Sequence, residues 1–172
     1  LNGNWTDVRE LYFNSNELDV CHPTITPDGK TFIFASNRPD GYGGMDLYVS
    51  YLVANRWTSP ENLGPEINTP GNEAFPYLHH DGNLFYASDG LAGLGGMDVF
   101  MAVPLNQEKK AKWAIPLNIG APFNSHYDDF GFILNRKEDA GFFSSNREGG
   151  KGSDDIYSFS LKNGFNQVKP SP

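Results

Sequence analysis

The chain has 172 residues, which is enough for one domain with a hydrophobic core. Its formal net charge of −8 argues against nucleic acid as the main partner, because phosphate binding requires a basic surface. A single cysteine, Cys21, excludes an internal disulfide bond, and no apolar run approaches the ~18 residues that a membrane-spanning helix needs.

The composition favours strands over helices. Aromatic residues make up 14% of the chain, which also contains 19 Gly and 12 Pro. Many aromatic residues together with many turn formers are typical of short strands joined by tight turns. No segment shows convincing helical spacing, and the longest basic run, Lys109, Lys110 and Lys112, is interpreted as a solvated loop. We therefore predict an all-β protein.

Three related units follow one another along the chain. They contain "HPTITPDGKTFIFASNRPDGYGGMDLYVSY", "FPYLHHDGNLFYASDGLAGLGGMDVFMA" and "FGFILNRKEDAGFFSSNREGGKGSDDIYSFS". Two anchors recur in each unit, a serine that begins a glycine-rich loop and an aspartate that closes it: Ser36, Ser88 and Ser145, and Asp46, Asp98 and Asp155. Both sets are spaced by 52 and then 57 positions, so the chain is predicted to repeat one supersecondary unit.

Each unit is predicted to contain four strands. In the first unit, "PTIT" and "KTFIFAS" flank a Pro-Asp-Gly turn, "MDLYVSY" follows the loop, and a strand with Trp57 leads to "NLG". The second unit repeats this order and carries Trp113. The "NT" pair at Asn68 recurs as "NS" at Asn124 and at Asn14, which indicates that the chain opens on the end of an earlier unit.

Four strands in a period of 52 to 57 residues are typical of a β-propeller blade. We predict three four-stranded blades plus the last strand of a preceding blade, which would carry Trp5. The predicted boundaries are 1–18 for the tail of the preceding blade, 19–71 and 72–127 for two blades, and 128–172 for the last. Because propellers usually close with four to eight blades, we expect half of a roughly six-bladed propeller, or two copies that meet face to face.

The glycine-rich loop "GYGGMD" permits three interpretations. A phosphate cradle requires a following helix, whereas "LYVSY" predicts a strand. A calcium site would draw on oxygen ligands from Asp40, Asp46, Asp89, Asp98, Asp154 and Asp155. In the third interpretation, which we favour, the loop is structural. Its glycines would adopt positive φ, and the aspartate and serine of each unit would accept bonds from the loop backbone.

Other residues capable of chemistry occupy non-equivalent positions. Cys21 is interpreted as a small buried side chain, with a reactive thiol or metal ligand as the alternative. The "HHD" segment, His79 to Asp81, lies at a predicted hairpin turn and could ligate a metal, although exposed turn histidines are commoner. His22 and His126 have no equivalents in the other units.

Carboxylates for a propeller hydrolase are a further possibility. The strongest candidates are Glu73, Asp128 and Asp129, because they lie at equivalent positions just before the first strand of their units. The chain contains no Gly-x-Ser-x-Gly motif, and one cysteine does not make a Cys-His-Asn set.

The long motifs resemble a known family. "HPTITPDGKTFIFASNRPDGYGGMDLYVS" is similar to the TolB-like, WD-repeat-like propeller repeat. Together with "LFYASDGLAGLGGMDVF" and "GFFSSNREGGKGSDDIYSF", it resembles the propeller of Bacteroidetes OmpA-family outer-membrane lipoproteins, including the PorE-type component of type IX secretion. The resemblance implies a periplasmic, outer-membrane-associated location. It also implies a scaffold role, with peptidoglycan contacted only through a separate OmpA-like domain that nothing in this sequence matches.

We therefore expect a non-enzymatic interaction module without a cofactor. Its expected partners are other cell-envelope proteins, together with the remaining blades of the same propeller or a second copy. A propeller that binds a glycan or a cation is the first alternative, and a glycoside hydrolase is the second.

Overall fold

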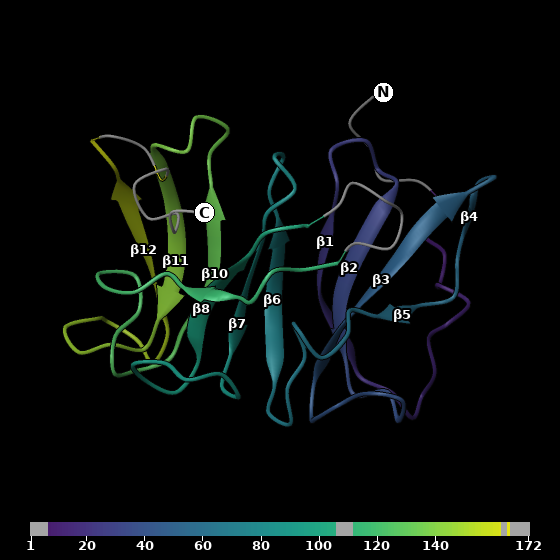
Figure 1. Ribbon diagram of the computed structural model, residues 1–172, viewed down its shortest axis with the longest axis horizontal. Helices are drawn as coiled ribbons and strands as arrows, with labels where there is room; N and C mark the ends of the chain where they lie inside the picture. Colours follow the sequence, from purple (N-terminus) through teal and green to yellow (C-terminus); the bar gives the residue numbers. More distant parts are fainter. Residues whose placement is uncertain (1–6, 106–111, 163–164, 166–172) are drawn as a thin grey trace.

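The computed structural model describes residues 7–105, 112–162 and 165. These residues form twelve β-strands and no α-helix, and the strands belong to three antiparallel sheets that stand side by side (Figure 1). The all-β prediction is confirmed. None of the described sheets closes on itself, and no helix in the described part of the chain is long and apolar enough to cross a membrane.

The first sheet contains five strands. They are β1 (Val20–Ile25), β2 (Thr31–Ser36), β3 (Asp46–Val53), β4 (Arg56–Trp57) and β5 (Glu61–Asn62). The first three follow one another as a meander, and β4 and β5 both pair with β3 at different points along its length. The expected fourth strand is therefore divided into two short pieces.

The second sheet has four strands, β6 (Glu73–Leu78), β7 (Leu84–Ser88), β8 (Asp98–Ala102) and β9 (Leu117–Asn118), in that order. Here Trp113 lies outside the named strands and forms only an isolated bridge with Pro104. Of the three sheets, this one alone has the four strands that the repeat predicts, and its fourth strand is two residues long.

The third sheet has three strands among the described residues. They are β10 (Asp129–Leu134), β11 (Ala140–Ser145) and β12 (Asp155–Ser160). The prediction of a four-stranded third unit thus differs from the structure, because no described segment pairs with the free edge of β12. Trp5 and the basic residues Lys109 and Lys110 lie outside the described residues. Residues 7–18 contain turns but no strand.

The serine and aspartate anchors occupy one position in all three sheets. Each pair is directly opposed across the second and third strands, as Ser36 with Asp46, Ser88 with Asp98, and Ser145 with Asp155. The pair closes the hairpin on both sides of the glycine-rich loop. The constant register explains why the two residue types share the same spacing along the chain.

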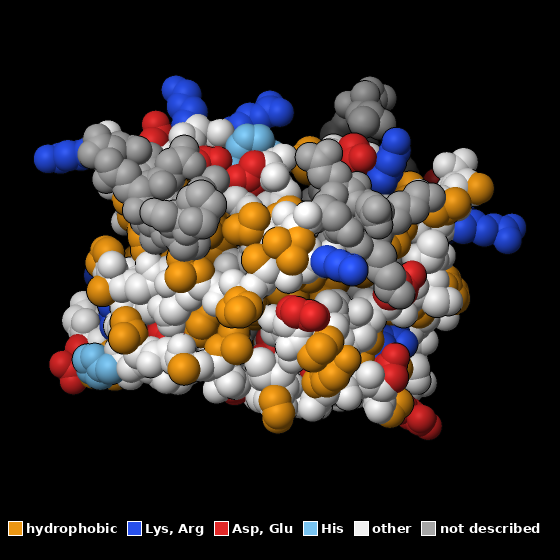
Figure 2. Space-filling view, in the orientation of Figure 1, with side chains coloured by type: hydrophobic (Ala, Val, Ile, Leu, Met, Phe, Trp, Pro, Cys, Tyr) orange, Lys and Arg blue, Asp and Glu red, His pale blue; other side chains and the backbone are white. Residues whose placement is uncertain are grey.

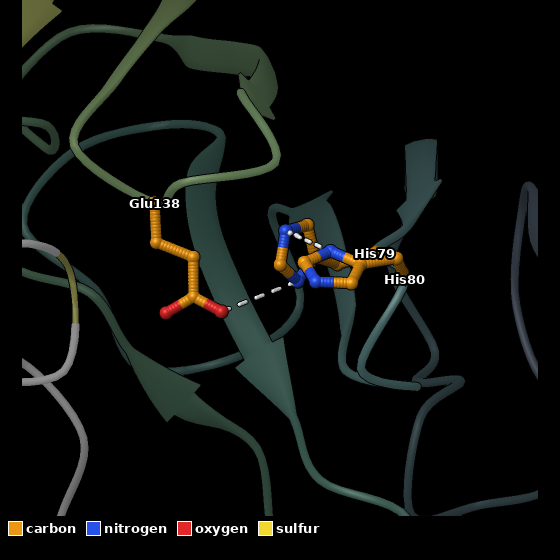
Figure 3. A group of neighbouring side chains, drawn as sticks. All are labelled: His79, His80 and Glu138. Atoms are coloured by element: carbon orange, nitrogen blue, oxygen red, sulfur yellow. Dashed lines mark hydrogen bonds and ion pairs between the residues drawn. The ribbon is translucent and has the colours of Figure 1, made fainter.

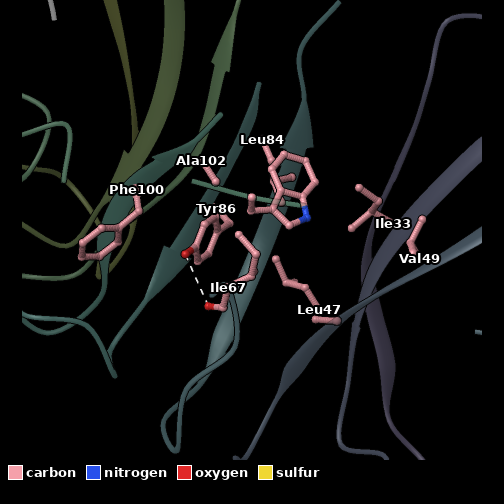
Figure 4. Packing of buried hydrophobic residues seen from close by; sticks show 10 residues of the cluster. Ile33, Leu47, Val49, Ile67, Leu84, Tyr86, Phe100 and Ala102 are labelled. Carbon is pink, nitrogen blue, oxygen red and sulfur yellow. Dashed lines mark hydrogen bonds between the residues drawn. The ribbon is translucent and has the colours of Figure 1, made fainter. Parts of the chain in front are cut away.

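Neighbouring sheets pack through the first strand of the later one. Strand β6 contacts β1, β2 and β3 of the first sheet, and β10 contacts β6, β7 and β8 of the second. Ile33, Leu47 and Val49 of the first sheet thus meet Leu84 and Tyr86 of the second across one hydrophobic core (Figure 4). A second core, centred on Phe85, Val99 and Phe132, joins the second sheet to the third.

Each first strand carries a β-bulge that the sequence does not reveal. The bulges interrupt the pairing of β1, β6 and β10, and the residues at equivalent points have positive φ: His22 at 51°, Phe75 at 50° and Gly131 at 64°. The ring of Phe75 stacks on His22 with centroids 3.7 Å apart and on Phe130 at 4.7 Å. The bulges therefore direct aromatic side chains of neighbouring first strands toward one another.

Candidate functional site

The glycine-rich loops span residues 37–45, 89–97 and 146–154. In the first loop, Asp46 is buried, and its carboxylate accepts backbone N–H groups from Tyr42 at 2.6 Å and Gly43 at 3.1 Å. The side-chain amide of Asn62, in β5, donates to the same carboxylate at 2.7 Å. One buried aspartate thus ties the loop backbone to the edge strand of its own sheet.

The other two loops use their aspartates in the same way. The backbone donors are the residues four and three positions before each aspartate: Leu94 and Gly95 for Asp98, and Lys151 and Gly152 for Asp155. Asp98 is fully buried, whereas the bonds to Asp155 are exposed to solvent. Because water competes with exposed bonds, the same geometry contributes less stability in the third loop.

The glycines serve a different purpose from the one expected. The glycines of the first two loops do not have positive φ. Instead, a Cβ at Gly41 would lie 2.8 Å from Oδ2 of Asp46, and a Cβ at Gly43 would collide with the backbone oxygen of Thr69. The expectation of left-handed backbone was wrong for these two loops, whereas Gly149 of the third loop has a φ of 91°. The glycines allow the loop to approach its own aspartate and the neighbouring segment closely.

The serines make two kinds of bond. Ser88 and Ser145 accept the backbone N–H of Gly90 and Arg147, at 3.1 Å and 3.2 Å, as expected for residues that brace the loop. Ser36 instead donates to the backbone oxygen of Asp19 at 2.7 Å. The serine of the first sheet therefore joins its first strand to its second.

A polar connection also joins neighbouring sheets. Oδ1 of Asn72, just before β6, accepts the backbone N–H of Met45 at 3.1 Å. Oδ1 of Asp128, just before β10, accepts that of Met97 at 2.8 Å. The same two loop residues accept a backbone bond of 2.6 Å from the first residue of β6 and of β10. Each glycine-rich loop is thus fixed to the first strand of the following sheet.

Two buried asparagines complete this connection, and sequence reasoning noted their repetition without giving them a role. Asn68 bonds both backbone groups of Leu47, donating at 3.0 Å and accepting at 2.7 Å. Asn124 makes the same pair of bonds with Val99, at 2.8 Å each. A side-chain amide that replaces a strand partner in this way satisfies buried backbone groups. The recurring "NT" and "NS" pairs were the signal for it.

The candidate hydrolase acids all accept hydrogen bonds near the start of β6 or β10. Glu73 is fully buried and accepts three bonds, two from Thr69 at 2.9 Å and 2.6 Å and one from Ser88 at 2.8 Å. Burial raises the pKa of the Glu73 carboxyl above its ordinary value, although these bonds oppose the shift. In this structure a substrate cannot reach the Glu73 carboxyl.

The other two candidate acids also have partners within the protein. Asp129 is fully buried and forms an ion pair of 2.6 Å with Arg147. Asp128 accepts from the side-chain amide of Asn146 at 2.8 Å, in addition to its bond with the preceding sheet. Glu73 and Asp129 hold the ends of their own first strands, and Asp128 holds its sheet to the preceding one.

The aspartates considered for calcium are separate from one another. Asp40 accepts a bond from the hydroxyl of Tyr48 at 3.2 Å, and Asp89 accepts two from Asn72. Within the described part of the chain, no three aspartates bring their oxygens close enough together to share one cation. Both carboxylate oxygens of Asp46 and Oδ2 of Asp98 accept N–H groups, whereas Oδ1 of Asp98 is buried without a hydrogen-bond partner among the described residues.

The histidines and Cys21 lie in three different places. Cys21 is half-buried, and burial together with the charge of Asp19 raises the pKa of its thiol, which disfavours the reactive thiolate. His126 packs beside the ring of Tyr127. His79 and His80 lie together on the turn between β6 and β7, where they meet Glu138 from the turn between β10 and β11. Sequence reasoning named both histidines but missed Glu138, which is about 60 positions away.

The aspartate of the first loop can be tested by removal. We expect Asp46→Ala to lower the free energy of unfolding by about 1–3 kcal/mol, because two backbone N–H groups and one amide lose their acceptor. Asp155→Ala is the matched control, since it removes two equivalent but exposed bonds and should cost less. Urea denaturation measures both. An unchanged stability of Asp46→Ala, or an equal loss in both variants, would contradict this role.

The raised pKa of Glu73 predicts a pH effect. Its ordinary pKa is 4.5, and a folded pKa above this value makes the protonated carboxyl favour the folded state. That contribution is fully present below pH 4.5 and is lost as the pH rises through the folded pKa. The unfolding free energy of the wild type should therefore fall, relative to that of Glu73→Gln, as the pH rises from 4.5 toward neutrality. Denaturation at several pH values measures the unfolding free energy of both proteins, and the exposed substitution Glu17→Gln serves as the control. A wild type that becomes more stable relative to Glu73→Gln as the pH rises would refute the prediction.

The sequence matches no protein-family model and no curated protein.

Proposed function

We propose that the chain is a segment of a β-propeller that serves as a non-enzymatic interaction scaffold in the cell envelope. In this proposal it belongs to a periplasmic, outer-membrane-associated assembly of the type IX secretion kind. The observation that carries the proposal is the repetition of one polar connection between successive sheets. Catalysis requires a single asymmetric site, whereas a scaffold built of blades requires the same connection at every boundary.

The uncovered outer face of the third sheet supports the proposal of a propeller. Phe142 and Ile156 occupy the positions that Ile33 and Leu47 hold in the first sheet. Ile33 and Leu47 are buried against the second sheet, but Phe142 is 50% exposed and Ile156 is 77% exposed. Positions of the repeat that are buried between the first and second sheets are thus exposed on the outer face of the third sheet. A further sheet packed there would bury them, as a propeller requires.

The first sheet presents the other half of such a boundary. Phe13 precedes Asn14 just as Ile67 precedes Asn68, and Ile67 fills the core between the first two sheets (Figure 4). Phe13 covers the equivalent face of the first sheet, where its ring stacks on Phe34 at 5.4 Å. The first sheet therefore already carries, in Phe13, the residue against which a preceding sheet would pack.

The surface suits protein contacts better than nucleic acid. On the face shown in Figure 2, apolar side chains are spread across the middle, and most of the Lys and Arg side chains lie apart from one another near the periphery. The formal net charge of −8 adds to this distinction. A propeller that binds a glycan or a cation is the second candidate, and the one observation that favours it is the His79–His80–Glu138 cluster.

The exposed third face yields a prediction about association. We expect the purified chain to associate as its concentration rises, because uncovered apolar surface favours contact between copies. Ile156→Lys should weaken this association, while Val53→Lys, a comparable change at a 49% exposed position of the first sheet, should leave it unchanged. Sedimentation equilibrium measures both effects. A wild type that remains monomeric and binds no hydrophobic dye would contradict the missing-sheet account.

The scaffold role is tested in cells. The tagged protein should fractionate with the outer membrane, and cross-linking in intact cells should recover defined envelope proteins in constant ratio. Cytoplasmic fractionation would refute the proposed location. Turnover of envelope glycans by the purified protein, lost in both Glu73→Gln and Asp129→Asn with the fold intact, would instead establish the hydrolase alternative.

A further inference from the structure

The turn between β6 and β7 and the turn between β10 and β11 bring three metal-binding side chains together. Each of His79, His80 and Glu138 offers one ligand atom, and these atoms lie within 4.8 Å of one another. Figure 3 shows the two imidazole rings side by side and the carboxylate extended toward them from the neighbouring sheet. We propose that His79, His80 and Glu138 bind a divalent transition-metal ion of the zinc type. This inference does not depend on the proposed scaffold function.

The distance between the two imidazole rings supports a shared cation. Nδ1 of His80 lies 2.9 Å from Nε2 of His79. Two nitrogens bound to one Zn²⁺ at about 2.0–2.1 Å in tetrahedral geometry are about 3.3 Å apart. A movement of a few tenths of an ångström therefore places both nitrogens on one ion. Without a cation, one of the two nitrogens must carry a proton to avoid opposed lone pairs.

The other nitrogen of His79 is already held by a carboxylate. Oδ1 of Asp81 lies 2.9 Å from Nδ1 of His79, whose side chain is only 2% exposed. A carboxylate that accepts this N–H fixes the tautomer and leaves the lone pair on Nε2, which faces His80. This is the arrangement in which protein histidines commonly bind zinc, with a second carboxylate behind the ligand ring.

Glu138 supplies the third ligand. Its Oε1 lies 3.8 Å from Nδ1 of His79, the nitrogen that faces Asp81, and its ligand oxygen lies within 4.8 Å of a ligand nitrogen of each histidine. Oε2 is buried without a hydrogen-bond partner among the described residues. A buried carboxylate oxygen without a partner is costly, and a cation would satisfy it. The residue also has a positive φ of 58°, an uncommon conformation for a side chain other than Gly, Asn or Asp.

The ligand set selects the class of metal. Two imidazole nitrogens and one carboxylate oxygen suit Zn²⁺ and its neighbours in the transition series, whereas Ca²⁺ and Mg²⁺ prefer oxygen ligands throughout. His80 is exposed and lines a hollow of about 340 Å³ together with Tyr77 and Arg136. Three protein ligands leave a fourth position for water or an exogenous ligand, and the hollow reaches the site at His80. The ion would also link the second and third sheets.

The binding test uses Co²⁺ as a spectroscopic probe and tag-free protein. We expect one Co²⁺ per chain, with the intense visible absorption of a four-coordinate site, and displacement of Co²⁺ by Zn²⁺ but not by Ca²⁺. His80→Gln and Glu138→Gln should each weaken binding at least tenfold. His126→Gln is the matched control, because His126 lies in another loop, and it should bind as the wild type does.

Three results would overturn the proposal. They are the absence of Co²⁺ binding to folded wild type, weak octahedral absorption that is indifferent to His80→Gln, and equal losses in His80→Gln and His126→Gln. Circular dichroism of each variant separates loss of the site from loss of the fold. Because His80 is exposed and Glu138 lies on a turn, both variants are expected to remain folded.

Discussion

The organisation of this protein depends on the backbone N–H groups of its glycine-rich loops. A loop that crosses from one strand to the next beside a neighbouring sheet is partly excluded from water, so its amides need acceptors within the protein. Asp46 and Asp98 supply them from buried positions, and each is opposed in the ladder by a serine. Ser88 also accepts an N–H group at the other end of its loop, whereas Ser36 bonds to the segment before β1. Without these acceptors the loop could not remain close to the following sheet.

The same loops determine how the sheets stack. Met45 and Met97, just before the two aspartates, bond to the residues that begin β6 and β10, so the end of one loop positions the first strand of the next sheet. Apolar packing then follows from this placement, because the two faces that meet carry the same pattern of residues at both boundaries. Of the carboxylates that looked suitable for catalysis, Asp128 is an acceptor at the second boundary, and Glu73 holds the start of the first strand of its own sheet.

The repeat made much of this predictable. The spacing of serines and aspartates located the strands on either side of each loop, because a repeated hairpin with one register must repeat its spacing. The divided fourth strand of the first sheet and the bulges at His22 and Phe75 were not predictable, because pairing at sheet edges depends on neighbours that no local pattern specifies. The glycine conformation of the first two loops was misjudged for a related reason, because the local sequence does not show which segments approach each other closely.

The histidine cluster shows the same limit for a candidate site. The adjacent histidines were visible in the sequence, but their partner Glu138 lies on a different sheet, and only the stacking of sheets brings it near.

Amide hydrogen exchange tests most directly whether Asp46 holds the backbone of the first glycine-rich loop. The amides of Tyr42 and Gly43 should exchange slowly in the wild type and rapidly in Asp46→Ala, while the β2–β3 ladder stays protected. Rapid exchange of both amides in the folded wild type would show that Asp46 does not hold the loop.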